Sequence, residues 1–409
     1  MMKKISYLLI VSLMSSFTLF TACGDKDDKN ETTDWKDYKY SELTPEQQKS
    51  KLQDDANAIL SELEGLSNGT GVQVLKTFYY WLNIDSPELG GSEKKSLRAS
   101  ETTIYLSNFV GKFTWNMVTE SWDYTEAADR LEFEFPAKNA ICNIVIPKIT
   151  SSVIIEVPDE NFSIEVPKDV TAKIYANQQQ VGTVHIVSEI VDDKTAPKLT
   201  EMTYSLDNYS WSTKVTKGSP NTLTSSLKKG DKTLFEASID LSGNLDNLLQ
   251  DKDPGKMEGN FFFNLNNTLA FAGNYKISDY TQALAQADQA DNSTFEAALA
   301  AYQAAGYTEE AYLIYRQAWD KAKETYVKAS VTAFNTYTDL WLISISDKTK
   351  IAQLKEKAKL VQYEDWSWWE EVPVLVFGDK TEVEAEVYFS SGFNLFLENW
   401  NKFIEGWNK

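Results

Sequence analysis

The chain has 409 residues, with 60 Asp and Glu against 40 Lys and Arg, a formal net charge of −20, two cysteines and one histidine. A surface this negative repels phosphate backbones, which argues against a nucleic-acid partner. One histidine and two cysteines cannot build the usual zinc centres, and we predict no metal and no cofactor.

The N-terminal residues "MMKKISYLLIVSLMSSFTLFTAC" are typical of an export signal. Two lysines precede an apolar run from Ile5 to Phe20, shorter than the roughly 20 apolar residues of a membrane-spanning helix. The run ends in "LFTAC", which resembles the lipobox of bacterial lipoproteins with Cys23 as the modified residue. The resemblance implies that residues 1–22 are a signal peptide and that acyl chains on Cys23 anchor the protein in a membrane. The alternative is an ordinary signal peptide followed by a free thiol.

Residues 23–43 are predicted to form an acidic flexible tether. The tract "GDKDDKNE" after Cys23 is too polar to bury enough apolar area to order itself. It also resembles the export signal of Bacteroidetes surface lipoproteins, which implies anchoring in the outer membrane with the body at the cell surface. A plain solvated tether is the alternative, and it leaves the leaflet open.

Residues 44–84 are predicted to form N-terminal helices. Thr44, Pro45 and Gln47 supply an N-cap, a first helical residue and a capping box. Apolar residues then recur at steps of three and four, which indicates a helix with one buried face. That stripe consists of Leu52, Ala56, Ile59, Leu63 and Leu66. The following segment, "VQVLKTFYYWLNI", is apolar throughout, and its pattern alone does not separate helix from strand.

From 102 to 277 the apolar period changes to two, with turn residues at intervals of 8 to 14 positions. Strands that follow strands without helices between them indicate an antiparallel meander. The sequences "KKGD" at 228–231 and "NLNN" at 264–267 are typical of hairpin turns. We expect about eight to eleven strands here, in an open sheet prone to curl.

Residues 279–341 are Ala-rich and predict an inserted helical hairpin. Ser293 with Glu296 forms a capping box, and Gly306 suits the end of a helix. Residues 342–409 return to strands, with a "GDK" turn at 378–380, and end in a predicted C-terminal helix. Its apolar stripe consists of Phe393, Phe396, Trp400, Phe403 and Trp407.

The predicted fold of 44–409 is a single α+β, β-rich domain. It is a long curled antiparallel meander sheet (open or half barrel) packed by N- and C-terminal helices. Two stretches, "NFVGKFTWNMVTESW…LEFEFP" and "PVLVFGDKTEVEAEVYFSSGFNLF", resemble a family of uncharacterised Bacteroidetes outer-membrane lipoproteins. The resemblance implies a surface location and a β-rich body, and it implies no activity.

The sequence singles out no catalytic residue. His185 lies inside a predicted strand, and the "GxSxG" motif of a serine nucleophile is absent. A glycoside hydrolase needs only two carboxylates, but among 60 acidic residues no spacing marks a pair. We therefore predict that the protein is not an enzyme.

The most suggestive segment is "YEDWSWWEEV", which places Tyr363, Trp366, Trp368 and Trp369 among carboxylates. Tryptophan faces stack on sugar rings or anchor protein interfaces, and carboxylates accept hydrogen bonds from hydroxyl groups. These four residues are our candidate ligand-binding site. The alternative is that they close the core between sheet and helices.

The sequence thus predicts a lipid-anchored envelope protein of non-enzymatic binding type, for a glycan, a hydrophobic ligand or a partner protein. A structural or adhesive surface protein is the alternative, with the helical hairpin as its partner face. A carboxylate-dependent glycoside hydrolase is less favoured.

Replacing Cys23 with Ala is expected to release the protein from membranes, because the acyl chains can no longer be attached. Fractionation of cells followed by immunoblotting measures this. Unchanged membrane association of the variant would contradict the lipidation of Cys23.

Overall fold

The computed structural model describes residues 35–85, 88–89, 95–96, 110–127, 129–137, 139–157, 162–191, 197–249, 252–363 and 366–390. Its helices are η2 (Trp35–Asp37), α2 (Pro45–Ser67), α3 (Thr70–Ile84), α4 (Leu245–Leu249), α5 (Ile277–Ala304), α6 (Glu309–Tyr337) and α7 (Ala385–Ser390). None of the described helices is long and apolar enough to cross a membrane. Cys23, and with it the predicted signal peptide and lipid anchor, lies outside the described residues.

The first strands are β1 (Lys39–Tyr40), β2 (Glu88–Leu89), β3 (Lys95–Ser96), β4 (Gly111–Asn116), β5 (Ser121–Thr125), β6 (Arg130–Ala137), β7 (Ala140–Pro147), β8 (Ser152–Val157), β9 (Phe162–Pro167), β10 (Asp169–Ala176) and β11 (Gln179–Glu189). The others are β12 (Leu199–Leu206), β13 (Tyr209–Thr216), β14 (Asn221–Lys229), β15 (Lys232–Leu241), β16 (Gly259–Leu265), β17 (Leu269–Tyr275), β18 (Thr338–Ser344), β19 (Thr349–Tyr363), β20 (Trp366–Phe377) and β21 (Glu382–Glu384).

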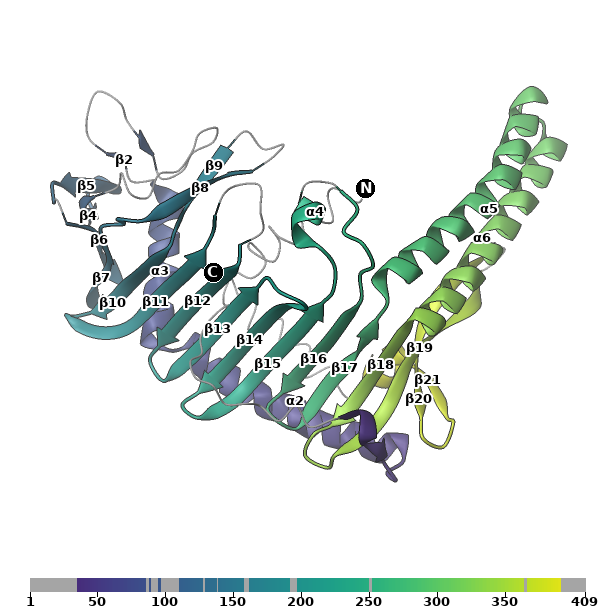
Figure 1. Cartoon of the computed structure of the whole chain (residues 1–409), viewed down its shortest axis with the longest axis horizontal. Helices are drawn as coiled ribbons and strands as arrows, with labels where there is room; N and C mark the ends of the chain where they lie inside the picture. The colour runs from purple at the N-terminus through teal and green to yellow at the C-terminus, as the bar shows by residue number, and fades with distance from the viewer. Residues whose placement is uncertain are drawn as a thin grey trace.

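One large sheet dominates the fold and confirms the α+β, meander-type prediction (Figure 1). It has 17 strands, does not close on itself, and pairs antiparallel except at β1–β19 and β4–β6. The strands β8–β9 and β2–β3 form separate hairpins. Between 102 and 277 the large sheet holds twelve strands, more than the eight to eleven expected. The segment "TEMTYSLDNYSWSTKV", for example, holds parts of two strands, β12 and β13, and the residues 207–208 between them include neither glycine nor proline.

The hairpin turns use backbone conformations that the sequence suggested. In the β16–β17 turn, Asn266 and Asn267 have φ values of 54° and 56°, and in the β14–β15 turn Gly230 has φ 54°. Positive φ values give these turns the twist of the flanking strands, and Asn and Gly adopt them at low cost. The turns predicted at 228–231, 264–267 and 378–380 are confirmed.

The two faces of the sheet differ in chemistry. We call the side on which α2 and α3 pack the helix face, and the opposite side the polar face. A register row on the helix face joins Tyr204, Trp211, Leu227, Phe235 and Leu265 on successive strands. These side chains pack with α2 and α3 in the main hydrophobic core. The predicted α2 stripe is confirmed, since Leu52, Ile59, Leu63 and Leu66 are each at most 7% exposed.

Helix α2 lies along a row of hairpin turns (Figure 1). Lys51 pairs with Asp347 in the β18–β19 turn, and Asp55 hydrogen-bonds Thr268 in the β16–β17 turn. Glu62 lies 2.7 Å and 2.9 Å from the amines of Lys229 and Lys232, which flank the β14–β15 turn. Each of these three hairpin turns therefore contacts a different residue of α2.

Helix α3 continues this row at the β12–β13 turn. The amide of Gly71 donates to Asp207 over 3.0 Å, so the carboxylate holds the first turn of α3. A Cβ on Gly71 would lie 3.0 Å from the carbonyl oxygen of Val181, which explains the glycine at this close approach. The structure resolves the ambiguous second apolar segment as a helix.

The helices α5 and α6 form the predicted hairpin, which projects from the strand ends opposite α2 (Figure 1). Gly306 ends α5 with φ 67°, as predicted. The capping box predicted at Ser293 does not start a helix, because α5 begins at Ile277 directly after β17, close to the predicted start of the insertion at 279. The amide of Lys276 donates to the carbonyl of Tyr337, which closes the root of the hairpin and starts the helix there.

The C-terminal part of the described chain is tied to the start of α2. The buried Tyr388 on α7 donates its hydroxyl to the carbonyl of Pro45 over 2.8 Å. The predicted stripe from Phe393 to Trp407 lies outside the described residues, so it stays a prediction.

Replacing Leu63 with Ala is expected to lower the free energy of unfolding by about 2–4 kcal/mol, because it leaves a cavity between α2 and the sheet. Denaturation in urea measures the change. The exposed Leu313 on α6, replaced by Ala, is the control and should lose less than about 0.5 kcal/mol. Equal effects of the two substitutions would show that α2 does not anchor the core.

Candidate binding site

The tryptophan segment predicted as a ligand site starts β20 and does not form one platform. Trp368 and Trp369 are neighbours on a strand, so their side chains point to opposite faces. Trp368 is 41% exposed, and its indole nitrogen lies 3.4 Å from a carboxylate oxygen of Glu370. Tyr363 and Trp366 pair in the backbone register, and their side chains lie outside what the structure describes.

Trp369 instead holds the root of the helical hairpin. The amine of Lys328 on α6 lies 4.5 Å from the centre of its ring, a distance suited to a cation–π contact. The interpretation that these tryptophans close the space between sheet and helices therefore holds for Trp369. Of the two tryptophans in this segment whose side chains the structure describes, Trp368 is exposed and Trp369 is half-buried.

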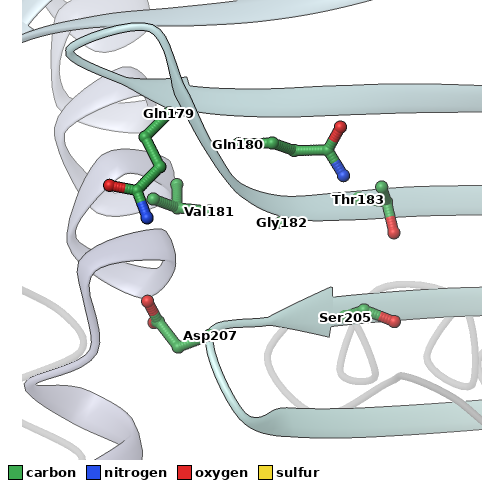
Figure 2. Close-up of a pocket in the computed structure, with 7 residues that line it drawn as sticks. All are labelled: Gln179, Gln180, Val181, Gly182, Thr183, Ser205 and Asp207. Carbon is green, nitrogen blue, oxygen red and sulfur yellow. The ribbon is translucent and has the colours of Figure 1, made fainter.

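A shallow pocket of about 350 Å³ lies where β11 and β12 meet the start of α3 (Figure 2). Its lining consists of Gln179, Gln180, Val181, Gly182, Thr183, Ser205 and Asp207. Figure 2 shows Gln179 and Asp207 on the side of the helix, and Gln180, Thr183 and Ser205 along the strands. Most of the lining groups are amides, hydroxyls and a carboxylate, which suit a hydroxyl-bearing ligand better than an acyl chain.

The close approach of β11 and β12 at the pocket requires a glycine at position 182. Gly182 pairs with Leu206 in the β11–β12 register, and a Cβ there would lie 2.7 Å from the carbonyl oxygen of Ser205. Only glycine lets the two strands come this close at this point. The sequence pattern gave no sign of the pocket, because its residues come from two strand ends and a turn.

A row of polar side chains continues from the pocket across the polar face. Register pairs place one polar residue on each of six successive strands, β11 to β16. We call this set the polar row, and it consists of His185, Thr203, Ser212, Ser226, Glu236 and Asn264. His185 lies 2.9 Å from a carboxylate oxygen of Asp169, which identifies it as a surface residue paired in the sheet. Thr224 and Lys214 beside the row are exposed.

Two carboxylates face α6 at the hairpin root: Glu371 of the tryptophan segment, and Glu356, which the sequence did not single out. Glu356 on β19 pairs with Pro373 and Glu371 on β20 pairs with Ala358, so the two acids are diagonal neighbours on the helix face. Burial raises the pKa of Glu356 to about 7, and the charge of Glu371 adds to the rise. Burial also raises the pKa of Tyr275 to about 12.

This pair does not form an open catalytic cleft. Asn335 on α6 covers Glu356, with its amide oxygen 3.0 Å from the Glu356 backbone nitrogen and its amide nitrogen 2.8 Å from the Glu356 carbonyl. The side chain of Asn335 therefore takes the place of a neighbouring strand. Among the described residues no group of three His, Cys, Asp or Glu side chains is arranged to hold a metal ion.

Comparisons with known proteins found no matching family model, no matching curated protein and no matching solved structure. The site must therefore be interpreted from its own residues.

Trp369→Ala is expected to lower the free energy of unfolding by about 2 kcal/mol, because a half-buried ring and its contact with Lys328 are lost. Trp368→Ala should cost less than about 0.5 kcal/mol, because its ring is exposed. Urea denaturation of both variants compares them. A larger loss for Trp368→Ala would contradict the assignment of the two faces.

Proposed function

We propose that this protein is a lipid-anchored protein of the bacterial outer membrane that binds a glycan chain on the polar face of its sheet. The lipid anchor on Cys23 and the surface location rest on the N-terminal sequence. The observation that carries the glycan proposal is the polar row, which spans six strands and continues the polar pocket at β11 and β12.

The chemistry of the row favours sugars. Hydroxyl and amide groups both donate and accept hydrogen bonds, and carboxylates accept them, as a chain of sugar hydroxyls requires. Successive members stand about 4.8 Å apart, the distance between neighbouring strands, so an extended ligand can contact several of them at once. Helices α2 and α3 lie on the other face of the sheet (Figure 1). On the polar face His185, Thr203, Ser226 and Glu236 are partly exposed, whereas Ser212 and Asn264 are buried.

A hydrophobic ligand is less well supported. The described pocket presents mainly polar groups, and an acyl chain placed there would leave amides and carboxylates without hydrogen bonds. The apolar side chains of the helix face are already packed against α2 and α3.

The tip of the helical hairpin favours a second candidate function, adhesion to a partner protein. Tyr307, Leu313 and Ile314 are 65%, 56% and 59% exposed there. The ring of Tyr307 packs edge-on against Tyr302, 5.1 Å between centroids, which holds it in place. Exposed aromatic and aliphatic residues of this kind are common anchors of protein interfaces.

The glycan proposal is tested by calorimetric titration of soluble oligosaccharides into the Cys23→Ala protein. Replacing both Thr203 and Ser226 with Leu is expected to weaken binding at least about tenfold, because two hydrogen bonds to the ligand are lost. Gln317→Leu, on the exposed side of α6, is the matched control and should leave affinity unchanged.

Two results would contradict the proposal. One is an unmodified protein that binds none of the sugars tested, including host mucin and plant polysaccharide fragments. The other is sugar binding that survives the double substitution unchanged. Binding of a protein through the hairpin tip would then favour adhesion.

A further inference from the structure

The hairpin of α5 and α6 contacts the rest of the protein only through a small root in the described structure. Helix α6 packs on β18, β19 and β20, and α5 enters directly from β17. With 29 residues, α6 extends about 43 Å, so most of the hairpin projects away from the sheet (Figure 1). Small changes at the root therefore translate into large movements of the tip.

The root holds two carboxylates, the half-buried Glu356 and the exposed Glu371, and neither belongs to an ion pair among the described residues. The Oε2 atom of Glu356 is buried and makes no hydrogen bond there. Glu371 is its diagonal neighbour on the adjacent strand. The amine of Lys355 donates to the carbonyl of Asn335, 3.2 Å away, rather than to either acid.

The other elements at the root supply mainly neutral groups. Tyr275 comes from β17, Tyr280 from α5, and Tyr326 with Ser330 from α6. Lys328 on α6 covers the ring of Trp369. Asp288 on α5 acts on Tyr326 and adds negative charge to the region.

The remaining charges of these strands point to the polar face. Lys357 and Lys359 pair there with Glu382 and Glu384 on β21. Asp339 on β18 accepts hydrogen bonds from Trp341 and Gln353 on the same side. On the face of the two carboxylates, the amine of Lys328 contacts the ring of Trp369 and pairs with Glu324 on its own helix.

We propose that Glu356 is a proton-sensitive latch for the helical hairpin. When Glu356 carries its proton, α6 stays seated on β19 and β20. When it loses the proton, a buried negative charge stands beside Glu371, and the hairpin loosens from the sheet.

The titration of Glu356 gives the pH at which this happens. Its ordinary pKa of 4.5 rises to about 7 in the docked state, through burial first and Glu371 second. Because the docked state holds the proton more tightly, docking is most stable below pH 4.5 and weakens as pH rises through about 7. Burial also raises the pKa of Tyr275, Tyr280 and Tyr326. These hydroxyl groups therefore stay protonated across this pH range and add no charge to the root.

The test measures the distance between the hairpin and the sheet by electron spin resonance. Spin labels are placed on exposed Gln317→Cys in α6 and Thr224→Cys in β14, in the full chain with Cys23→Ala. We expect a narrow distance distribution at pH 5.5 and a broad one at pH 8.5. Between pH 4.5 and about 7 the docking equilibrium should weaken by up to about tenfold per pH unit, the limit for one proton, and above about pH 7 it should level off.

Three variants separate this latch from a general charge effect. Glu356→Gln should keep the narrow distribution at pH 8.5, since it cannot ionise. In Glu371→Gln the distance distribution should broaden less than in the parent protein, and at a lower pH. The reason is that the charge of Glu371, which helps to raise the pKa of Glu356, is removed. Glu370→Gln is the control, because Glu370 lies beside Trp368 on the opposite face, and it should behave like the parent.

The proposal is overturned if the parent protein shows the same distribution at both pH values. It is also overturned if Glu356→Gln broadens like the parent, or if Glu370→Gln narrows the distribution as much as Glu356→Gln does. Circular dichroism at both pH values confirms that each variant is folded. If Glu356→Gln does not fold, Glu371→Gln is the deciding variant. Less broadening than in the parent protein supports the latch, and the same broadening overturns it.

Discussion

The structure depends on a match between the rise of helix α2 and the spacing of the hairpins it crosses. Seven helical residues rise about 10.5 Å, and two strands of a sheet span about 9.6 Å. Asp55, Glu62 and the start of α3 at Gly69 are seven residues apart, and they meet the turns of three successive hairpins. An open sheet of this length would otherwise be free to twist and curl, and one helix fixes it turn by turn.

This arrangement separates the chemistry of the two sides of the sheet. Helices α2 and α3 and their apolar stripe cover the helix face, and the polar row runs along the other face, where we propose that a glycan binds. The same division governs the β19–β20 ribbon, where Trp369 and Glu356 lie under α6 while Trp368 and Glu370 lie on the other side. The sheet and the projecting hairpin are therefore distinct parts of the structure, joined at β17, β18, β19 and β20.

Much of the fold could be predicted from local signals. The stripe from Leu52 to Leu66, the Thr44–Gln47 capping box and the Asn266–Asn267 turn are set by neighbouring residues, and each is confirmed. The candidate site was harder to predict. Trp368 and Trp369 look equivalent in the sequence. Only the alternation of side chains along β20 places them on opposite faces of the sheet. Glu356 and Glu371 are fifteen residues apart, and nothing in their spacing tells that a helix from another part of the chain covers them.

The most direct test of the account is the insertion of one alanine into α2 between Asn57 and Ala58. The insertion rotates the C-terminal half of α2 by about 100°, so Leu52 and Leu63 can no longer share one face. The account predicts a loss of at least about 4 kcal/mol in the free energy of unfolding, measured in urea. The same insertion between Gly306 and Tyr307 at the hairpin tip should cost little. Equal stability of the α2 insertion and the unmodified protein would show that the helix does not set the spacing of the sheet.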